Sequence, residues 1–401
     1  MVGVDILMIS NSNPSSNIFG WLSKESKTVM KFGITPEFVM SSYICDELLE
    51  EIFKRLPSKT LLQLRSLSKS WCSRISSPDF ILTQTTLQTA RNYQNILIQH
   101  RTSSFQNFFT VHYQSMLNSQ YGNYGTRPMK SPNGYIVGSC NGIICLRDHY
   151  SGNFSLWNPS IRRKLTLPYP FFSLNNYEIA GVGFDSKTDD YKIVILSCFR
   201  HGKHKSMVYS LKKPVWREIT PPSSRITCVN SPGCVVNGVL HWVVRSDVFQ
   251  DFILTFDLSS DVFSEMTLPE KPNQYTKQHP IIFNGSLGML VSTKDCYHRV
   301  WAMKEYNNVT SWYMTLNFGD HPYEGIHAVL QLKNGNLLIR NHNLVMNFHP
   351  NGELCSVVCM PEYSTLSIVG MVMYVESLAL LDIGTVCNTE QIVLSHETTK
   401  W

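Results

Sequence analysis

The feature that most constrains the fold is a regular recurrence of Asn-Gly pairs. They start at residues 133, 141, 237, 284, 334 and 351, and this dipeptide is the strongest short signal for a β-hairpin. Those at Asn141, Asn237, Asn284 and Asn334 precede strand-like runs. The last two intervals are 47 and 50 residues, and the first, 96 residues, is twice 48. A turn and strand at 188–198 fall inside that long interval, so a unit of nearly constant length repeats.

Each unit has a second half that reads as strand, polar turn, strand. These halves occupy residues 156–168, 208–219, 254–269, 300–316 and 345–361. Corresponding positions at 158, 210, 257, 302 and 347 are separated by 52, 47, 45 and 45 residues. Four short strands per unit with this period are typical of the blades of a β-propeller in the kelch or WD size range.

Five units are visible, and the two ends of the domain can supply a sixth. Strands over 95–99 and 108–113 can join a terminal strand within 367–381, which would close the ring and leave no exposed sheet edge. We therefore predict a six-bladed β-propeller closed by N- and C-terminal strands over residues 90–385, with a tail at 386–401. An irregular β-sandwich is the alternative.

A small all-α module is predicted before the propeller, at 37–85. Residues 1–36 are rich in Ser and Asn and lack periodicity, so we expect them to be disordered. In 46–57 apolar residues recur at helical spacing, charged residues occupy the other side, and Pro57 ends the pattern. Shorter helices are predicted over 59–68 and 69–76.

The second of these helices has more leucine than one buried stripe requires. Leu61, Leu62, Leu64 and Leu67 spread over roughly 220° of its surface. Three helices of this length cannot bury enough surface to be stable alone. Two interpretations follow: the leucines pack on the chain's own β domain, or they form an exposed docking face for a partner.

Residues 44–80 resemble an F-box. The matching words are Leu56-Pro57-Ser58-Lys59, Ser68-Lys69-Ser70-Trp71 and Ser77-Pro78 followed by Phe80. The resemblance implies docking on the Skp-type adaptor of a cullin-based SCF ubiquitin ligase. The family usually opens with Leu-Pro where this chain has Ile44-Cys45, and that proline belongs to the adaptor contact in the family. We therefore expect reduced adaptor affinity, with Ile44 alone in the apolar role.

Residues 90–385 resemble the plant F-box-associated domain. The words that match are Gly138 to Leu146, Trp157-Asn158-Pro159-Ser160, Gly183-Phe184-Asp185 with Asp190-Tyr191-Lys192, Asn237 to Trp242, Phe256-Asp257-Leu258 and Tyr374 to Leu378. In that family the domain selects the protein to be ubiquitinated. The resemblance does not name the target.

Composition excludes several classes of protein. Hydrophobic residues make up 43% and charged residues 16% of the 401 residues, as in an ordinary globular protein. The net charge of +5 comes without a run of Lys or Arg, which argues against nucleic acid as the main partner. The 11 cysteines are dispersed without a C-x-x-C pair, as expected of free thiols in a reducing compartment. Without a signal peptide or a membrane span, we expect a soluble protein of the cytoplasm or nucleus, or both.

Three groups of residues could carry chemistry, and each has a simpler explanation. Gly138 to Gly142 has the outline of a nucleophile elbow around Cys140, but a strand follows where a helix is needed. Residues 198–204 contain Cys198, His201 and His204 without a nearby fourth metal ligand, which favours a loop. His241 lies in a strand and is expected to be a packed residue.

We therefore predict a substrate-recognition subunit of an SCF-type ligase that has no catalytic residues, metal or cofactor of its own. Its partners would be the Skp-type adaptor, through it a cullin scaffold, and an unidentified target protein, but neither nucleic acid nor membrane. The rival hypotheses are a protein-interaction scaffold outside any ligase, and a propeller enzyme. The residues predicted to bind the adaptor are Ile44, Leu48, Leu49, Ile52, Leu56, Pro57, Leu61, Leu64 and Trp71.

Overall fold

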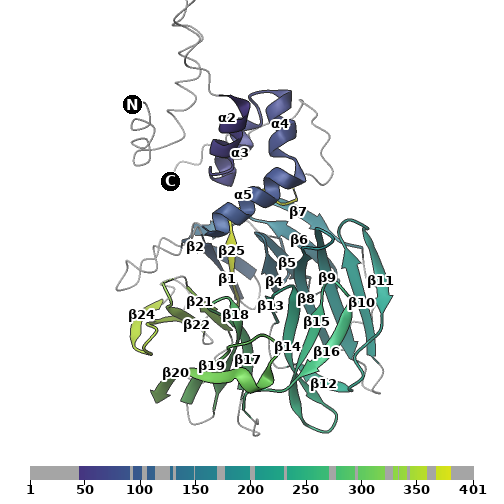
Figure 1. Ribbon diagram of the computed structural model, residues 1–401, viewed down its shortest axis with the longest axis vertical. Helices are drawn as coiled ribbons and strands as arrows, with labels where there is room; N and C mark the ends of the chain where they lie inside the picture. Colours follow the sequence, from purple (N-terminus) through teal and green to yellow (C-terminus); the bar gives the residue numbers. More distant parts are fainter. Residues whose placement is uncertain are drawn as a thin grey trace, which may run out of the picture. The chain divides into compact units, whose positions relative to one another are not determined.

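The computed structural model divides the chain into two compact units, residues 1–75 and residues 76–401 (Figure 1). Each unit is described by itself. The structure describes residues 45–90, 94–101, 106–112, 127–129, 132–148, 150–168, 177–198, 204–229, 233–270, 277–293, 297–320, 328–332, 334–340, 344–358 and 367–380. The predicted disordered segment 1–36, Ile44 and the tail 386–401 lie outside these ranges.

The first unit contains three short helices: α2 (Asp46–Phe53), α3 (Ser58–Leu64) and α4 (Lys69–Ile75). They are in the order that the apolar periodicity predicts. Helix α2 ends at Phe53, earlier than predicted, and a turn leads from it to Pro57. Ser68 caps helix α4, because its hydroxyl accepts a hydrogen bond from the backbone N–H of Trp71 at 3.1 Å.

A fourth helix, α5 (Pro78–Ala90), begins the second unit and was not predicted. Its buried residues recur at helical spacing, but three of them, Gln84, Thr85 and Gln88, are polar, so hydrophobicity alone does not reveal the stripe. Pro78 at the first position favours a helix start. No helix in the described ranges is long and apolar enough to cross a membrane.

The rest of the second unit consists of six antiparallel sheets, which confirms the predicted fold class. The first sheet has the order β25-β1-β2-β3, with β25 (Ser367–Val375), β1 (Gln94–Arg101), β2 (Gln106–His112) and β3 (Arg127–Met129). The second contains β4 (Tyr135–Cys140), β5 (Ile143–Arg147), β6 (Phe154–Asn158) and β7 (Arg163–Thr166). The third contains β8 (Tyr177–Asp185), β9 (Asp190–Cys198), β10 (His204–Ser210) and β11 (Val215–Ile219).

The remaining three sheets follow the same plan. The fourth contains β12 (Ile226–Val229), β13 (Cys234–Val236), β14 (Val239–Ser246), β15 (Asp251–Asp257) and β16 (Val262–Met266); β12 and β13 both pair with β14. The fifth contains β17 (Lys277–Phe283), β18 (Ser286–Ser292), β19 (Tyr297–Met303) and, after the short 3-10 helix η3 (Val309–Ser311), β20 (Trp312–Asp320). The sixth contains β21 (Ala328–Gln331), β22 (Leu337–Arg340), β23 (Val345–Phe348) and β24 (Leu354–Val358).

The six sheets form a closed ring, as Figure 1 shows for the order of the blades. Their first strands neighbour one another in the order β25, β4, β8, β12–β13, β17, β21 and back to β25. Strand β25 comes from the C-terminal end and pairs with β1 in the register Asn95↔Tyr374 to Ile98↔Met371. The prediction that both ends of the domain share one blade is confirmed.

The Asn-Gly turns have the backbone that two-residue hairpins require. In the pairs that begin at Asn141, Asn237 and Asn284, both residues have positive φ, between 48° and 79°. Asn and Gly tolerate this left-handed region better than other residues, and such turns match the twist of the flanking strands. In the pair at Asn334 only Gly335 has a positive φ, of 90°. The Asn-Gly dipeptide therefore predicts the position of a turn reliably, but it predicts the type of turn less reliably.

Connections on a blade alternate between its two ends, which defines two faces of the propeller. The first face, called the entry face, carries the Asn141-Gly142 turn and residues 376–380 after β25; helix α5 leads to it, because β1 starts opposite Val375. The second, called the distal face, carries the β5–β6 and β14–β15 turns.

The motif Trp157-Asn158 joins the second blade to the closing blade. The amide of Asn158 donates hydrogen bonds to the backbone oxygens of Ser377 at 3.0 Å and Ala379 at 2.9 Å. Trp157 packs edge-on against Phe108 with 5.7 Å between ring centroids. The Asn158 hydrogen bonds hold the chain just after β25, and Trp157 packs on β2 of the same closing blade, so both contacts support ring closure.

Residues in the sequence motifs around Asp185 and Trp242 join the third blade to the fourth. Lys192 contacts Asp185 at 3.2 Å and Asp261 at 3.1 Å, and Asp185 also accepts a hydrogen bond from Ser259 at 2.8 Å. The indole of Trp242 donates to the backbone oxygen of Ala180 at 3.2 Å. These motifs, which resemble the F-box-associated domain, therefore contain residues that make contacts between neighbouring blades.

Two glycine substitutions test the closing contact. Gly142 (φ +79°) and Gly238 (φ +75°) occupy equivalent turns, but an added Cβ would lie 2.3 Å from Ser377 Oγ at Gly142 and contact nothing within 4 Å at Gly238. We expect Gly238→Ala to cost about 1 kcal/mol from backbone strain alone. Gly142→Ala should cost about 1 to 3 kcal/mol more, because it also overpacks the residues after β25. Denaturant unfolding of the full chain measures both, and equal losses would contradict a special role for the 142–377 contact.

Candidate functional site

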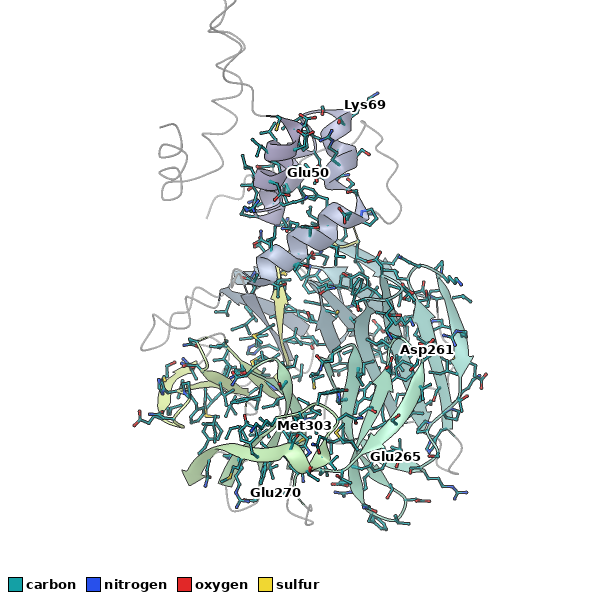
Figure 2. All side chains as sticks on the ribbon, in the orientation of Figure 1. Glu50, Lys69, Asp261, Glu265, Glu270 and Met303 are labelled. Atoms are coloured by element: carbon teal, nitrogen blue, oxygen red, sulfur yellow. The ribbon has the colours of Figure 1, made fainter. Side chains whose placement is uncertain are left out.

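The exposed apolar surface of the helical unit lies mainly on helix α2. Leu48 and Ile52, one helical turn apart, are 58% and 41% exposed. Phe53 on the same helix is buried, so α2 has one apolar stripe inside and a second one facing solvent. In Figure 2, Glu50 marks this helix and Lys69 marks the start of α4. Large apolar side chains left in water within so small a unit indicate a surface for another molecule.

Helices α2 and α4 are joined by an aromatic and ionic contact. The rings of Phe53 and Trp71 lie 4.7 Å apart. Arg74 lies over the Trp71 ring at 5.3 Å and contacts the carboxylates of Asp46 at 3.2 Å and Glu50 at 3.9 Å. Each exposed ion pair contributes little alone, about 0 to 1 kcal/mol, but together these contacts hold α2 in one orientation. The Leu48–Ile52 stripe is therefore presented by a braced helix.

The leucines in and after helix α3 divide between the interior and the surface of the helical unit. Leu61 and Leu64 are completely buried, at 0% and 1% exposure, so they do not belong to an exposed docking face. A leucine at the inner side of a helix in so small a bundle is needed for its core. Leu62 is half-buried, and Leu67, beyond the end of α3, is 39% exposed. Of the four leucines at positions 61, 62, 64 and 67, Leu67 is the one exposed to solvent.

The other residues predicted to bind the adaptor differ in their exposure to solvent. Leu49, Leu56 and Trp71 are half-buried, and Pro57 is exposed. Leu67 was one of the four leucines considered for a docking face, whereas the bracing residue Arg74 was not singled out from sequence. The pairing of Arg74 with Asp46 and Glu50 on another helix had no signal in the local sequence, because opposite charges far apart in the chain do not reveal their contacts.

Ion pairs order the solvent side of α2. Lys54 contacts Glu50 at 3.0 Å and Glu51 at 3.1 Å, and Arg55 contacts Glu51 at 2.9 Å. The hydrogen bond from Lys54 is the main reason that the pKa of Glu51 lies below its usual value. These i to i+3 and i to i+4 pairs support the helix and leave the Leu48–Ile52 stripe uncharged.

Cys140 and His241, the two residues considered for catalysis from the sequence, have structural positions in the propeller. Cys140 precedes the Asn141-Gly142 hairpin between β4 and β5, and burial raises the pKa of its thiol to about 12, so it is not an activated nucleophile. His241 is buried with its Nε2 3.1 Å from the hydroxyl of Tyr306. Burial lowers the pKa of His241 to about 4 and raises that of Tyr306 to about 12, so each is held in its neutral form.

The segment around His204 has a structural role in the described residues. His204 Nε2 accepts a hydrogen bond from the backbone N–H of Ile226 at 2.9 Å, which joins the third and fourth blades. His201 lies outside the described ranges. Within them, no group of three or more His, Cys, Asp and Glu side chains is placed to hold a metal ion.

A buried histidine makes propeller stability depend on pH. His100 is 2% exposed and its ring nitrogens have no hydrogen-bond partner among the described residues; burial lowers its pKa to about 4. The unfolded chain takes up this proton near pH 6.5 but the folded chain only near pH 4. Protonation of His100 therefore leaves the free energy of unfolding unchanged well above pH 6.5 and lowers it progressively as pH falls toward 4. The loss approaches about 1.4 kcal/mol per pH unit.

We therefore expect His100→Leu to flatten the decline in unfolding free energy between pH 6.5 and 4.5. Denaturant titrations at several pH values measure the slope. His241→Leu should act in the same direction, since its pKa is lowered by the same cause. A His100→Leu slope equal to that of the unchanged protein would contradict this assignment.

The structure defines a class by its architecture: a small helical unit with an exposed apolar stripe, followed by a six-bladed β-propeller. Two family models match the chain. The F-box domain matches residues 42–83, and the F-box associated beta propeller domain matches residues 93–374. The chain belongs to the family of F-box proteins with an F-box associated β-propeller.

Curated relatives agree with this assignment. An F-box/kelch-repeat protein of Arabidopsis thaliana is 29% identical over 282 residues, which cover 66% of this chain and 77% of the relative. The F-box protein CPR1 of the same plant is 28% identical over 300 residues, covering 66% of this chain and 70% of the relative. The expectation of a plant F-box protein with a substrate-receptor architecture is confirmed.

Proposed function

We propose that this chain is the substrate-recognition subunit of an SCF-type (Skp–cullin–F-box) ubiquitin ligase of the cytoplasm or nucleus. The observation that carries the proposal is the solvent-facing Leu48–Ile52 stripe on a braced helix within the F-box match. The Skp-type adaptor would bind this stripe and, through it, a cullin scaffold. The propeller would bind the target protein.

The apolar stripe has the size and chemistry of half of a helix-in-groove contact. Its anchors are one turn apart, as expected for a helix face that enters an apolar groove of a partner. Exposed Leu67 and half-buried Leu49 and Leu56 add apolar surface on the same unit. Glu50 and Glu51 of α2 already pair with Lys54 and Arg55, so docking on the Leu48–Ile52 stripe does not require these carboxylates to lose their partners.

Such a subunit acts by proximity. A ligase complex that holds target and ubiquitin-charged enzyme on one scaffold converts their encounter into an effectively intramolecular reaction. This role needs two binding surfaces and a stable body, and the blade junctions of the propeller supply the stable body. This role would require no nucleophile or metal from this chain.

Adaptor binding is tested by changing the exposed stripe. We expect Leu48→Asp with Ile52→Asp to weaken binding to a purified Skp-type adaptor by about 30-fold or more, because charges would replace apolar anchors at an interface. Co-expression followed by affinity capture and titration calorimetry measures the loss. Both side chains already face solvent, so the helical content and melting temperature should remain close to those of the unchanged protein.

Val262→Asp is the matched control, because Val262 is 53% exposed but lies on β16 of the propeller. It should bind the adaptor normally. Leu61→Asp is unsuitable as a docking test, since it places a charge at a fully buried position and would unfold the helices. Undiminished adaptor binding by the Leu48–Ile52 variant, or no binding by the unchanged chain, would overturn the ligase assignment and leave the scaffold hypothesis.

A further inference from the structure

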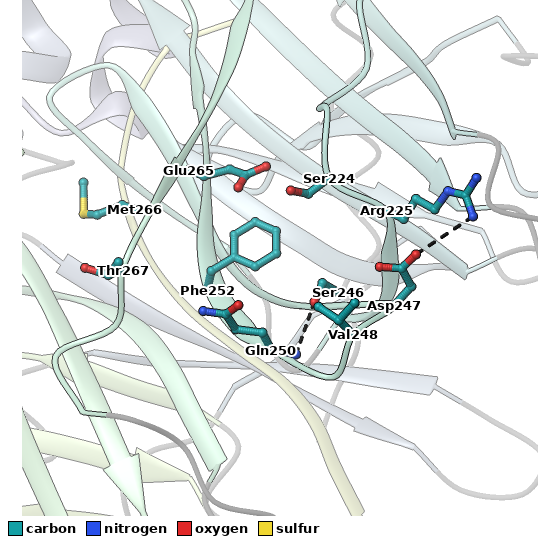
Figure 3. A pocket seen from close by; sticks show the side chains of 10 residues that line it. All are labelled: Ser224, Arg225, Ser246, Asp247, Val248, Gln250, Phe252, Glu265, Met266 and Thr267. Atoms are coloured by element: carbon teal, nitrogen blue, oxygen red, sulfur yellow. Dashed lines mark hydrogen bonds and ion pairs between the residues drawn. The ribbon is translucent and has the colours of Figure 1, made fainter.

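A cavity of about 290 Å³ opens on the distal face of the fourth blade (Figure 3). Its lining comes from the segment before β12, the β14–β15 turn and the end of β16, and includes Arg225, Asp247, Val248, Phe252 and Glu265. This volume is close to the lower end of small-ligand sites and suits one or two amino-acid side chains.

The turn beside the cavity presents two large apolar side chains to solvent. Val248 is 73% exposed and Phe249 is 84% exposed. Tyr150, at 88%, lies in the β5–β6 turn of the same face. A side chain that remains in water adds nothing to the core, so Phe249 does not contribute to folding through burial.

Phe249 also carries backbone strain. Its φ is +61°, a left-handed conformation that most often belongs to Gly, Asn or Asp and is unfavourable for a bulky residue. Elsewhere in the described chain this region is occupied largely by Asn and Asp, as at Asn141, Asn237 and Asp261. An aromatic residue here costs stability, and this cost is of the kind found at binding sites.

Hydrogen bonds hold the turn in this conformation. The N–H of Phe249 donates to Ser246 O at 3.1 Å, and the N–H of Ser246 donates to Gln250 O at 2.9 Å. The N–H of Gln250 donates to the Ser246 hydroxyl at 3.2 Å, and that of Asp247 to Arg225 O at 3.0 Å. The Val248–Phe249 pair is therefore pre-organised, which lowers the entropic cost of binding.

Of the described carboxylates at and behind the cavity, two form ion pairs with arginines and one does not. Arg225 pairs with Asp247 at 4.0 Å, and Arg245 behind the turn pairs with Asp251 through two contacts at 2.5 and 2.9 Å. Glu265, on the opposite wall, has no ion-pair partner among the described residues and is exposed. The ring of Phe252 lines the same cavity. A carboxylate near an aromatic ring favours a Lys or Arg side chain, whose stem packs on the ring while its charge meets the acid.

We propose that this cavity binds an extended segment of the target protein in which a Lys or Arg stands next to a large apolar residue. The basic side chain enters the cavity toward Glu265, and the apolar neighbour packs on Val248 and Phe249. This site rests on the proposed function, of which it would be the target-recognition surface.

The binding test uses two pools of fluorescein-labelled, capped nonapeptides in a Ser/Gly/Ala background. One pool has Lys or Arg followed by Leu or Phe at the centre, and the other has Glu in place of the basic residue. Fluorescence polarisation with the full chain, co-purified with its adaptor, should show binding of the basic pool that weakens as salt rises, and none of the acidic pool. Equal binding of both pools, or of neither, would overturn the inference.

Variants of the turn separate binding from stability. Phe249→Gly and Phe249→Asn remove the ring and suit the left-handed backbone, so we expect about tenfold weaker peptide binding with a melting temperature no lower than that of the unchanged protein. Glu265→Gln should weaken binding of the basic pool about three- to tenfold and reduce its salt dependence. Tyr313→Ser, which removes a 48% exposed aromatic from β20 on another blade, is the control and should leave binding unchanged.

The two proposals fail in different ways. If Phe249→Gly binds peptides like the unchanged protein while the adaptor still co-purifies, the site is wrong and the ligase role stands. If the adaptor never binds but the basic pool does, the peptide site stands without the ligase role.

Discussion

The pairing of β25 with β1 is the contact on which the rest of the second unit depends. It brings residues 367–375 from one end of the domain beside residues 94–101 from the other, and it turns an open row of blades into a ring. In an open row, the first and last blades would each expose an unpaired edge and half of an interblade core. The amide of Asn158 and the close approach of Gly142 to Ser377 hold the same closure from the second blade. Long-range pairing of this kind has a high entropic cost, which several local contacts must offset.

Ring closure also explains where function can reside. Asp185, Lys192 and Trp242 lie in the motifs that resemble the F-box-associated domain. They are engaged between blades and hold the body together. Residues that face solvent at the turns are free to vary without loss of the ring, as is usual for loops on a rigid scaffold. The strained and exposed Phe249 belongs to this second group. In the proposed receptor role, one stable body would carry turns that set the choice of target.

Some features of the chain could be predicted from sequence, and others could not. The turn signals at Asn141, Asn237 and Asn284 act locally, because two residues with positive φ already determine a hairpin, and their even spacing revealed the blades. Helix α5 was missed because its buried face contains Gln84 and Gln88, so the periodic pattern is not one of hydrophobicity. Among the leucines of α3, the pattern could not separate inward Leu61 and Leu64 from outward Leu67, since all are equally apolar and only packing distinguishes them.

The sequence by itself indicated three short helices and a repeated β unit with five visible copies, because turn chemistry and periodicity operate over a few residues at a time. The F-box-like module came from a resemblance over residues 44–80. The tertiary structure decided which apolar side chains are left in water and which charges lack a partner. Leu48 and Ile52 became a candidate docking stripe only when Phe53, Leu61 and Leu64 were seen to fill the interior. Exposure and ion pairing depend on residues that are distant in the chain, and for this reason the candidate surfaces could be located only in the folded protein.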